Sequence, residues 1–185
     1  LIAELFCALD ATVTDAITSQ RLEAVQATRA EASRRFFAQF GSEYREHQDL
    51  IARLSDYGPR VVERTATIAH DAIVLEIGPG GGELLPELAS FAKEVIALDV
   101  SAEMLTQAKA RARANQVSNI RFVHGDTSNA LSLELPPAQA IVMNMVLHHI
   151  AKPAEIFHHV AALLAPGGRF LLTELCDHSH GEKAR

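Results

Sequence analysis

The sequence predicts an α/β fold with a doubly wound, mostly parallel sheet and a helical extension at its N-terminus. Short apolar segments of strand length alternate with helical segments from residue 72 onward, a pattern typical of parallel strands with helices on both faces. A glycine-rich turn follows the first of these strands and leads into a helix. Doubly wound sheets hold nucleotides where their elements occur in this order.

The first predicted strand reads Ala-Ile-Val-Leu-Glu-Ile from residue 72 and runs directly into a Gly-Pro-Gly-Gly-Gly turn. Its apolar residues, interrupted by a single glutamate, predict a buried strand. Gly78, Gly80 and Gly82 allow the backbone to pass close to a ligand. Apolar residues at helical spacing follow, and Pro86 falls in the first turn of that helix, where its missing N–H is harmless. The segment therefore predicts a nucleotide site at a helix N-terminus.

Two acids narrow the class of nucleotide. The dinucleotide fingerprint requires its third glycine at the position of Glu83, and a carboxylate there would face a pyrophosphate. This disfavours a nicotinamide cofactor and with it a dinucleotide oxidoreductase. The next predicted strand, 95–99, ends in Asp99, whose carboxylate can accept hydrogen bonds from both ribose hydroxyls. An acid at this spacing is common to nucleotide-binding folds, so Asp99 does not discriminate among them.

The sequence resembles a known family at four places, in the family's order. The segments 76–82 and 97–105 are similar to the first two motifs of class I S-adenosylmethionine-dependent methyltransferases. His124-Gly-Asp126 resembles a later motif, and the segment 163–172 resembles the turn into the family's fifth strand. The resemblance implies a methyltransferase that takes S-adenosylmethionine as its cofactor and releases S-adenosylhomocysteine.

The resemblance also implies which residues bind the cofactor. The glycine motif would hold the amino-acid tail, Asp99 the ribose and Asp126 the adenine amino group. Met104, in a helix predicted over 102–114 with Ser101 as its N-cap, would lie against the adenine, although a core methionine gives the same pattern. Gly125-Asp126 after the predicted strand 120–124 is equally consistent with a simple turn. The full set implied is Glu76, Gly78, Gly80, Gly82, Asp99, Val100, Met104, Asp126, Thr127 and Asn144.

The predicted strand 140–144 leads to the candidate catalytic residues. Its carboxyl end is expected to open on the crevice where ligands bind in such sheets, so Asn144, His148 and His149 are expected near the transferable methyl group. A histidine titrates near neutral pH and can serve as a base for a nitrogen or oxygen nucleophile. A histidine that is only hydrogen-bonded at a strand end fits the sequence as well.

Residues 1–68 are expected to form a helical extension that acts as a linker or lid. The apolar stripe over residues 1–19 packs on the core or forms a homodimer through the N-terminal helices. The segment 32–44 resembles the entry to methyltransferase domains fused behind arsenic-repressor-type winged helices. On that interpretation nucleic acid is contacted only by a domain outside this sequence. A second helical stretch is predicted from residue 20 to a stop at Gly41.

Two further helices are predicted before the first strand. One covers 42–56 and is closed by Tyr57-Gly58-Pro59, and a short one then runs to Ile68. In related methyltransferases such a segment covers the cofactor or shapes the substrate pocket. Tyr44 and His47 are therefore candidate pocket residues, although a surface pair fits the sequence as well.

The core domain is expected over residues 69–185. Residues 128–137 are predicted as loop, 153–165 as a helix with Phe157 among its inward residues, and 169–175 as a strand. The family's sheet normally adds two more strands after this point, so the sequence is expected to be a fragment whose last two strands are missing.

Composition limits the partners. The formal net charge of −6 and a pI near 5.8 give no electrostatic footprint for nucleic acid. Two cysteines and the lack of an apolar run of membrane length favour a cytoplasmic protein. Neighbouring histidines on a helix diverge, and no acid–histidine helix motif or Cys-x-x-Cys is present, so no metal site is expected. The acceptor is expected to be an unidentified small molecule. The alternative is a non-catalytic effector domain of a transcriptional regulator that binds S-adenosylmethionine without turnover.

Overall fold

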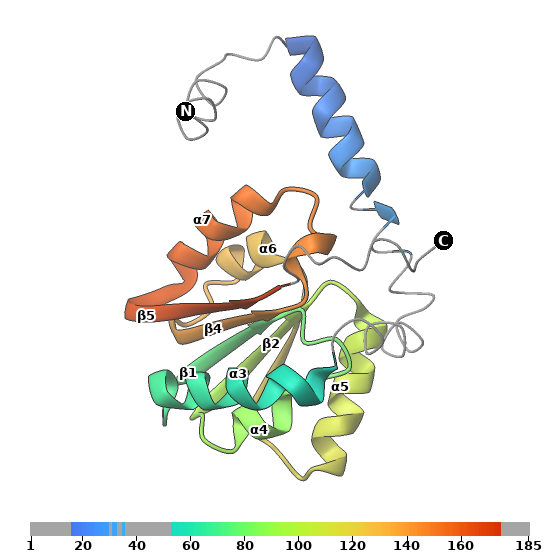
Figure 1. The fold of residues 1–185 in the computed structure, drawn as a ribbon. Coiled ribbons are helices and arrows are strands. Elements are labelled where there is room, and N and C mark those ends of the chain that lie inside the picture. Colours follow the sequence, from blue (N-terminus) through green and yellow to red (C-terminus); the bar gives the residue numbers. More distant parts are fainter. Residues whose placement is uncertain (1–15, 30, 33–34, 36–52, 175–185) are drawn as a thin grey trace.

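The computed structural model describes residues 16–29, 31–32, 35 and 53–174. Within these residues a five-stranded parallel sheet has the order β3-β2-β1-β4-β5 (Figure 1). Its strands are β1 (Ile73–Ile77), β2 (Glu94–Asp99), β3 (Ile120–His124), β4 (Ala138–Asn144) and β5 (Leu164–Thr173). The predicted doubly wound parallel sheet is therefore confirmed.

Helices cover both faces of this sheet. They are α3 (Leu54–Ala69), α4 (Leu85–Ala89), α5 (Ala102–Ala114), α6 (Thr127–Ser132) and α7 (Pro153–Leu163). In Figure 1 the first three lie on one face and the last two on the other. Two apolar clusters show the same division: one joins α3, α4 and α5 to the sheet, and the other joins α6 and α7 to it. The central strands are buried on both faces, which explains their continuous apolar sequences.

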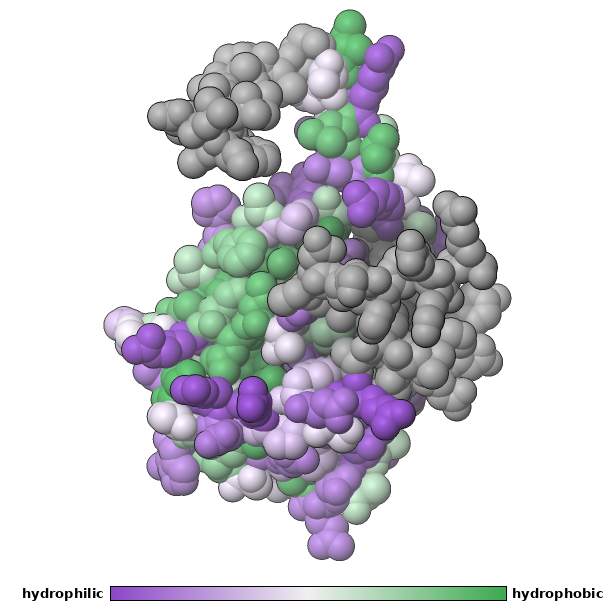
Figure 2. All heavy atoms as spheres, in the orientation of Figure 1, coloured by the Kyte–Doolittle hydropathy of each residue, from purple (hydrophilic) through white to green (hydrophobic). Residues whose placement is uncertain are grey.

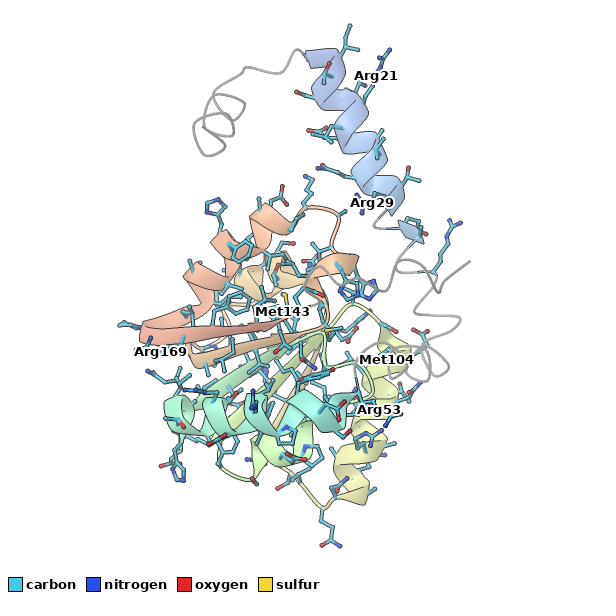
Figure 3. All side chains as sticks on the ribbon, viewed as in Figure 1. Arg21, Arg29, Arg53, Met104, Met143 and Arg169 are labelled. Atoms are coloured by element: carbon cyan, nitrogen blue, oxygen red, sulfur yellow. The ribbon has the colours of Figure 1, made fainter. Side chains whose placement is uncertain are left out.

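Figure 3 shows the sheet interior and the N-terminal helix in one view. Met143 lies inside the sheet, whereas Arg21 and Arg29 project from a helix over residues 16–29. This helix crosses the predicted junction at residue 20 as one continuous segment, and it exposes Ile17, Leu22 and Val25. Apolar surface also lies over α7 and β5, where Phe157 and Leu172 are exposed (Figure 2).

The start of α5 confirms the sequence prediction. The Ser101 side chain accepts a hydrogen bond from the Met104 amide at 3.2 Å, as an N-cap residue does. Pro86 lies in the first turn of α4, as predicted. Both features mark where these helices begin, after the carboxyl ends of β2 and β1 respectively.

The predicted break at Tyr57-Gly58-Pro59 is wrong, because α3 runs through it from Leu54 to Ala69. Pro59 is exposed, so the hydrogen bond that it cannot donate is lost on the solvent side. Gly58 is buried close to Leu84, and a Cβ atom there would lie 3.1 Å from the Leu54 side chain. Packing on the sheet thus outweighs the local helix-breaking signal.

Three further details differ from the sequence predictions. Residues 127–132 form α6 rather than loop, because the Asp126 side chain caps this helix in a capping box with Asn129. The helix predicted over 153–165 ends at Leu163, and the strand predicted from 169 already begins at Leu164. Phe157 does not point inward: it is 48% exposed and meets Phe170 edge to face, with ring centroids 6.1 Å apart.

Several predictions fall outside the described residues. These are the roles of Tyr44 and His47, the helix over 42–56 up to residue 52, and most of the apolar stripe over 1–19. The homodimer, the division at residue 68 and the two additional strands stay predictions. Among the residues that the structure does describe, no helix has the length and apolar character needed to cross a membrane.

Candidate functional site

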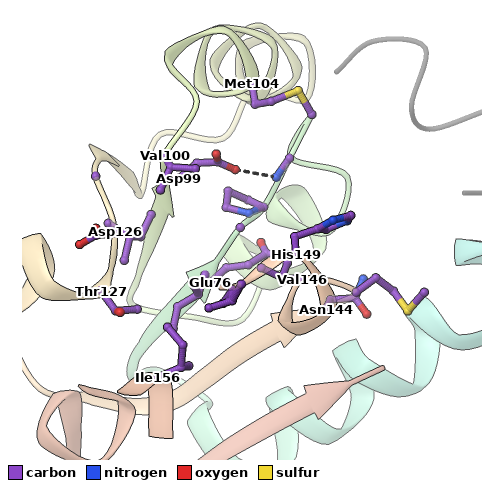
Figure 4. A pocket seen from close by; sticks show the side chains of 18 of the residues that line it. Glu76, Asp99, Val100, Met104, Asp126, Thr127, Asn144, Val146, His149 and Ile156 are labelled. Atoms are coloured by element: carbon purple, nitrogen blue, oxygen red, sulfur yellow. Dashed lines mark hydrogen bonds between the residues drawn. The ribbon is translucent and has the colours of Figure 1, made fainter. Parts of the chain in front are cut away.

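A cavity of about 710 Å³ opens at the carboxyl ends of the strands (Figure 4). It lies where the chain leaves β1 and β4 toward opposite faces of the sheet, the position at which open α/β sheets bind their ligands. The volume suits a molecule of nucleoside size. Most of the residues singled out from the sequence line it: Glu76, Gly78, Gly80, Asp99, Val100, Met104, Asp126, Thr127, Asn144 and His149.

The glycine turn has the geometry that its sequence predicts. Gly78, Gly80 and Gly82 all have positive φ angles, of 67°, 57° and 76°. A Cβ atom at Gly78 would lie 2.6 Å from the Val146 side chain, so this glycine lets the segment after β4 approach the turn. Gly82 does not line the cavity, and a Cβ there would lie 2.8 Å from that of Ala108. Gly82 therefore serves the packing of the turn on α5, while Gly78 and Gly80 face the cavity.

Asp99 connects the end of β2 to the glycine turn. Its carboxylate accepts hydrogen bonds from the Gly80 amide at 3.2 Å and from the Ser101 amide at 2.8 Å. The first of these is the dashed line in Figure 4. Burial raises the pKa of Asp99, and the backbone hydrogen bonds partly oppose that rise. A carboxylate has about four acceptor positions, so these two bonds leave room for ligand hydroxyl groups.

Glu76 and Asn144 each bury an oxygen that has no hydrogen-bond partner in the described structure, Oε2 and Oδ1 respectively. The two side chains lie at the ends of the neighbouring strands β1 and β4, and both line the cavity (Figure 4). Burial, together with the charges of Glu83 and Asp99, raises the pKa of Glu76 from its ordinary 4.5 to about 8. Buried acceptors without donors are rare in folded proteins, so this pair indicates a ligand that donates hydrogen bonds here.

The walls beside Asp99 are apolar. Met104 is 8% exposed and its methyl group lies near Gly80, where a Cβ atom would be 3.3 Å away. Val100, in contrast, is 44% exposed although it follows a buried strand. Val100 lines the cavity between the buried residues Asp99 and Ser101, so it presents an apolar surface that suits a flat ring.

The Asp126 side chain caps the N-terminus of α6. One carboxylate oxygen, Oδ1, accepts from the Ser128 and Asn129 amides and from the Ser128 hydroxyl at 2.6–3.0 Å. Burial raises the pKa of Asp126, but these hydrogen bonds and the nearby His159 outweigh it and lower the pKa overall. The turn interpretation and the ligand role are therefore compatible, because Oδ2 takes part in none of these bonds.

The two candidate catalytic histidines occupy different places. His149 lines the cavity, whereas His148 does not. The Nδ1 atom of His148 lies 2.6 Å from the Glu174 carboxylate, which also accepts from the His148 amide at 3.2 Å. The ring centroids of the two histidines are 3.9 Å apart. The Met145 amide donates to the Thr173 carbonyl at 2.9 Å, so the whole segment after β4 is fixed to the end of β5.

Burial and the neighbouring His148 lower the pKa of His149 to about 4, against a smaller opposite effect of Glu174. His149 is therefore a neutral imidazole at physiological pH, able to accept a proton or a hydrogen bond.

Two cavity residues have no signal in the local sequence. The Arg111 guanidinium donates to the Gly81 carbonyl at 2.9 Å and pairs with Glu83 at 3.2 Å. The His159 ring, on α7, lies 2.8 Å from the Thr127 hydroxyl on α6. Arg111 was one of several arginines on a helix, and His159 one of a histidine pair, so only the fold shows their partners. Within the described residues no group of three or more metal-ligating side chains is found.

Comparison with known proteins decides the family. A family model described as a methyltransferase domain matches residues 74–168, which is more than half of the chain. The chain belongs to the class I S-adenosylmethionine-dependent methyltransferases. The family match covers β2, β3 and β4, nearly all of β1 and the first half of β5, together with the glycine turn and the histidine segment.

Individual methyltransferases resemble the chain over part of their length. The tRNA 5-carboxymethoxyuridine methyltransferase of Escherichia coli (strain K12) is 30% identical over 135 residues, 72% of this chain and 47% of the relative. The crystal structure of YcgJ from Bacillus subtilis has a TM-score of 0.55 at 29% identity, over 62% of this chain and 48% of YcgJ. The DhpI–SAH complex has a TM-score of 0.63 at 25% identity, over 80% and 70% of the two chains. The chain spans about half the length of the curated relatives it matches.

Proposed function

We propose that this methyltransferase domain transfers a methyl group from S-adenosylmethionine to a small-molecule acceptor at the cavity beside β1 and β4. The observation that carries the proposal is the pair of buried acceptors, Glu76 Oε2 and Asn144 Oδ1, at the edge of a cavity of nucleoside size. The ammonium group of the cofactor supplies the donors that these oxygens lack. The glycine turn supplies the close backbone approach: Gly78 and Gly80 line the cavity with positive φ angles, and the lack of a side chain at Gly78 lets the segment that carries Val146 pack against the turn.

The remaining contacts follow from the chemistry of each wall. Asp99 accepts from the ribose hydroxyls, while Met104 and Val100 lie against the adenine. Asp126 Oδ2 accepts from the adenine amino group, with Thr127 beside it. The bound cofactor supplies a methyl group that its sulfonium already activates. The protein then contributes chiefly by orientation, which can lower a barrier by roughly 7–11 kcal/mol.

His149 is the candidate base for the acceptor. It lines the cavity and is unprotonated at physiological pH, so it is available to accept a proton from an attacking hydroxyl or amine. Its pKa of about 4 makes it a weaker base than an ordinary histidine, and its contribution is to orient the acceptor and take the proton as the methyl group is transferred. His148 contributes by position only: its bond to Glu174 fixes the segment from which His149 projects.

The charge of the cavity favours a small acceptor over RNA. Among the residues that the structure describes, five acids besides the buried Glu76 line it, against two cations, Arg111 and Lys152. These acids are Glu23, Glu83, Asp99, Asp126 and Glu155. These negative charges would repel the phosphodiester backbone of RNA, but they would not repel a neutral or cationic acceptor.

The test is release of S-adenosylhomocysteine when the protein and S-adenosylmethionine are incubated with a fractionated metabolite extract. Once an acceptor is found, the His149→Gln variant is expected to lose about 10²-fold or more in kcat, in the range of general-base effects. His158→Gln is the matched control, because His158 is exposed on α7 and does not line the cavity. Tight cofactor binding without any turnover would instead favour the effector-domain alternative, and equal rates for the two variants would remove His149 from the mechanism.

A further inference from the structure

The most unusual group in the cavity is the Glu76 carboxyl. It is 2% exposed, it lies in the centre of the sheet between β2 and β4, and no cation pairs with it in the described structure. Its Oε2 atom has no hydrogen-bond partner. An ionised carboxylate in such a place costs several kcal/mol unless a donor or a positive charge reaches it.

The groups that face Glu76 across the cavity do not supply a compensating charge. The two charged groups that influence Glu76 most, Glu83 and Asp99, are acids whose negative charges oppose its ionisation. Of the two described cations that line the cavity, Arg111 is already bonded to Glu83 and to the Gly81 carbonyl, and Lys152 to Glu155. The titratable and charged groups of the surrounding elements are Tyr57 from α3, Glu83 before α4, Asp99 from β2, Arg111 from α5 and His149 after β4.

We propose that Glu76 is protonated in the ligand-free cavity and releases its proton to solvent when a ligand with a primary ammonium group binds beside Asn144. This inference rests on the same cavity as the proposed function but not on turnover. The ammonium group places a full positive charge and N–H donors against two acceptors that otherwise lack them. An opposite charge at this distance favours the ionised acid, so the proton that Glu76 carried is lost to water.

The pKa of Glu76, about 8 without ligand, gives the sign of the effect. Below pH 8 the free protein holds the proton and the complex does not, so rising pH favours the complex. Affinity is expected to rise by as much as about tenfold per pH unit between roughly pH 6.0 and 7.5. The window stops there because Glu76 itself begins to lose its proton in the free protein as the pH approaches 8.

The experiment is isothermal titration calorimetry of the whole protein at pH 6.5 in phosphate and in imidazole buffer. Because these buffers differ in ionisation enthalpy, the difference in observed heat gives the number of protons released. S-adenosylmethionine and S-adenosylhomocysteine, which both carry the ammonium group, are expected to release most of one proton each. 5′-Methylthioadenosine, which lacks the amino-acid part, is expected to release none.

The Glu76→Gln variant keeps the size of the side chain and removes the titration. It is expected to bind S-adenosylhomocysteine with no proton release and with an affinity that is flat between pH 6.0 and 7.5. Glu87→Gln, an exposed change on α4, is the matched control and retains the release.

Two results would overturn the inference: binding of S-adenosylhomocysteine without proton release by the wild-type protein, or undiminished release in Glu76→Gln. Neither result touches the proposed function, which fails instead if no methyl acceptor is turned over. A thermal unfolding curve for Glu76→Gln identifies a folding defect separately, and direct measurement of the wild-type release decides the inference in that case.

Discussion

The guanidinium of Arg111, in the last turns of α5, donates to the main-chain carbonyl of Gly81, 30 residues earlier in the chain. This bond and the ion pair with Glu83 join the helix after β2 to the turn after β1. Both segments contribute residues that line the cavity, among them Gly78, Gly80, Met104 and Arg111. Arg111 therefore holds the glycine turn at its distance from Met104 and Asp99.

Replacing Arg111 by alanine is expected to weaken cofactor binding about fivefold. The loss is moderate because the Arg111 side chain is 44% exposed, so water screens the pair with Glu83. The dissociation constant for S-adenosylhomocysteine, measured by calorimetry, checks this. Arg113→Ala, an exposed arginine on the same helix that does not line the cavity, is the control and should bind as the wild type does. Equal affinities in the two variants would contradict the role of Arg111.

Replacing Asp99 by alanine is expected to weaken binding of S-adenosylmethionine tenfold or more, which corresponds to about 1.4 kcal/mol. The change removes the acceptor for the ribose hydroxyls and also releases the Gly80 and Ser101 amides. Asp99→Asn keeps the shape and one acceptor, so an intermediate affinity is expected. Calorimetry with S-adenosylmethionine and with NAD measures the loss of affinity in each variant and shows which of the two ligands the wild-type protein binds more tightly. An unchanged affinity in Asp99→Ala, or tighter binding of NAD, would contradict the assignment of the cavity.

Replacing Gly78 by alanine is expected to abolish cofactor binding and to destabilise the fold. The residue has a φ angle of 67°, and its Cβ would lie 2.6 Å from Val146. The left-handed conformation alone costs about 1–2 kcal/mol, and the overlap with Val146 adds to it. Gly167→Ala separates the two effects, because Gly167 has a φ angle of 77° and no atom lies within 4 Å of the position that its Cβ would take. Urea unfolding should show a larger loss for Gly78→Ala than for Gly167→Ala, with Val146→Ala restoring part of the difference.

Replacing Glu76 by glutamine is expected to stabilise the ligand-free protein. The folded-state pKa of about 8 lies above the unfolded value near 4.5, so the contribution of Glu76 to stability is fully present below pH 4.5 and is lost as the pH rises toward 8. At pH 7 the loss amounts to about 3 kcal/mol, which the variant avoids. Urea unfolding at pH 5 and pH 8 measures the effect. A gain that is no larger at pH 8 than at pH 5 would contradict a protonated Glu76.

The pH profile of turnover is expected to lack an acid limb from His149 near pH 6.5. Its pKa of about 4 keeps the imidazole neutral down to that region, so the base form persists across the usual range. The profile of kcat/KM between pH 5 and 8 checks this once an acceptor is known. A fall in kcat with an apparent pKa near 6.5 that His149→Gln removes would show that the cavity does not hold this histidine neutral.

Much of the fold, and the cavity residues that follow β1 and β2, could be predicted from the sequence because their signals are local. The glycine turn, the acid at the end of β2 and the Ser101 cap each depend on a few consecutive residues. The sequence does not reveal α6, because its capping box uses Asn129 in place of the usual Glu or Gln. The continuity of α3 through Pro59 is also hidden, since only tertiary packing shows that the proline faces solvent.

The residues that complete the cavity depend on contacts between distant segments. Arg111 meets Gly81 across 30 residues, and His159 meets Thr127 across 32. No spacing in the sequence marks either of them. The separate positions of His148 and His149 also follow from the fold alone, because Glu174 lies at the end of β5.

The attachment of the histidine segment to β5 makes one edge strand of the described sheet the support of the candidate base, His149. The Met145 amide donates to Thr173, the His148 amide donates to Glu174, and the His148 Nδ1 atom lies 2.6 Å from the same carboxylate. Fraying of the last residues of β5 would therefore release His149 from its place in the cavity. On the proposed function, a change that loosens this edge strand lowers turnover without altering a residue that lines the cavity. The rate of hydrogen–deuterium exchange at the Met145 amide measures how often its bond to the Thr173 carbonyl opens.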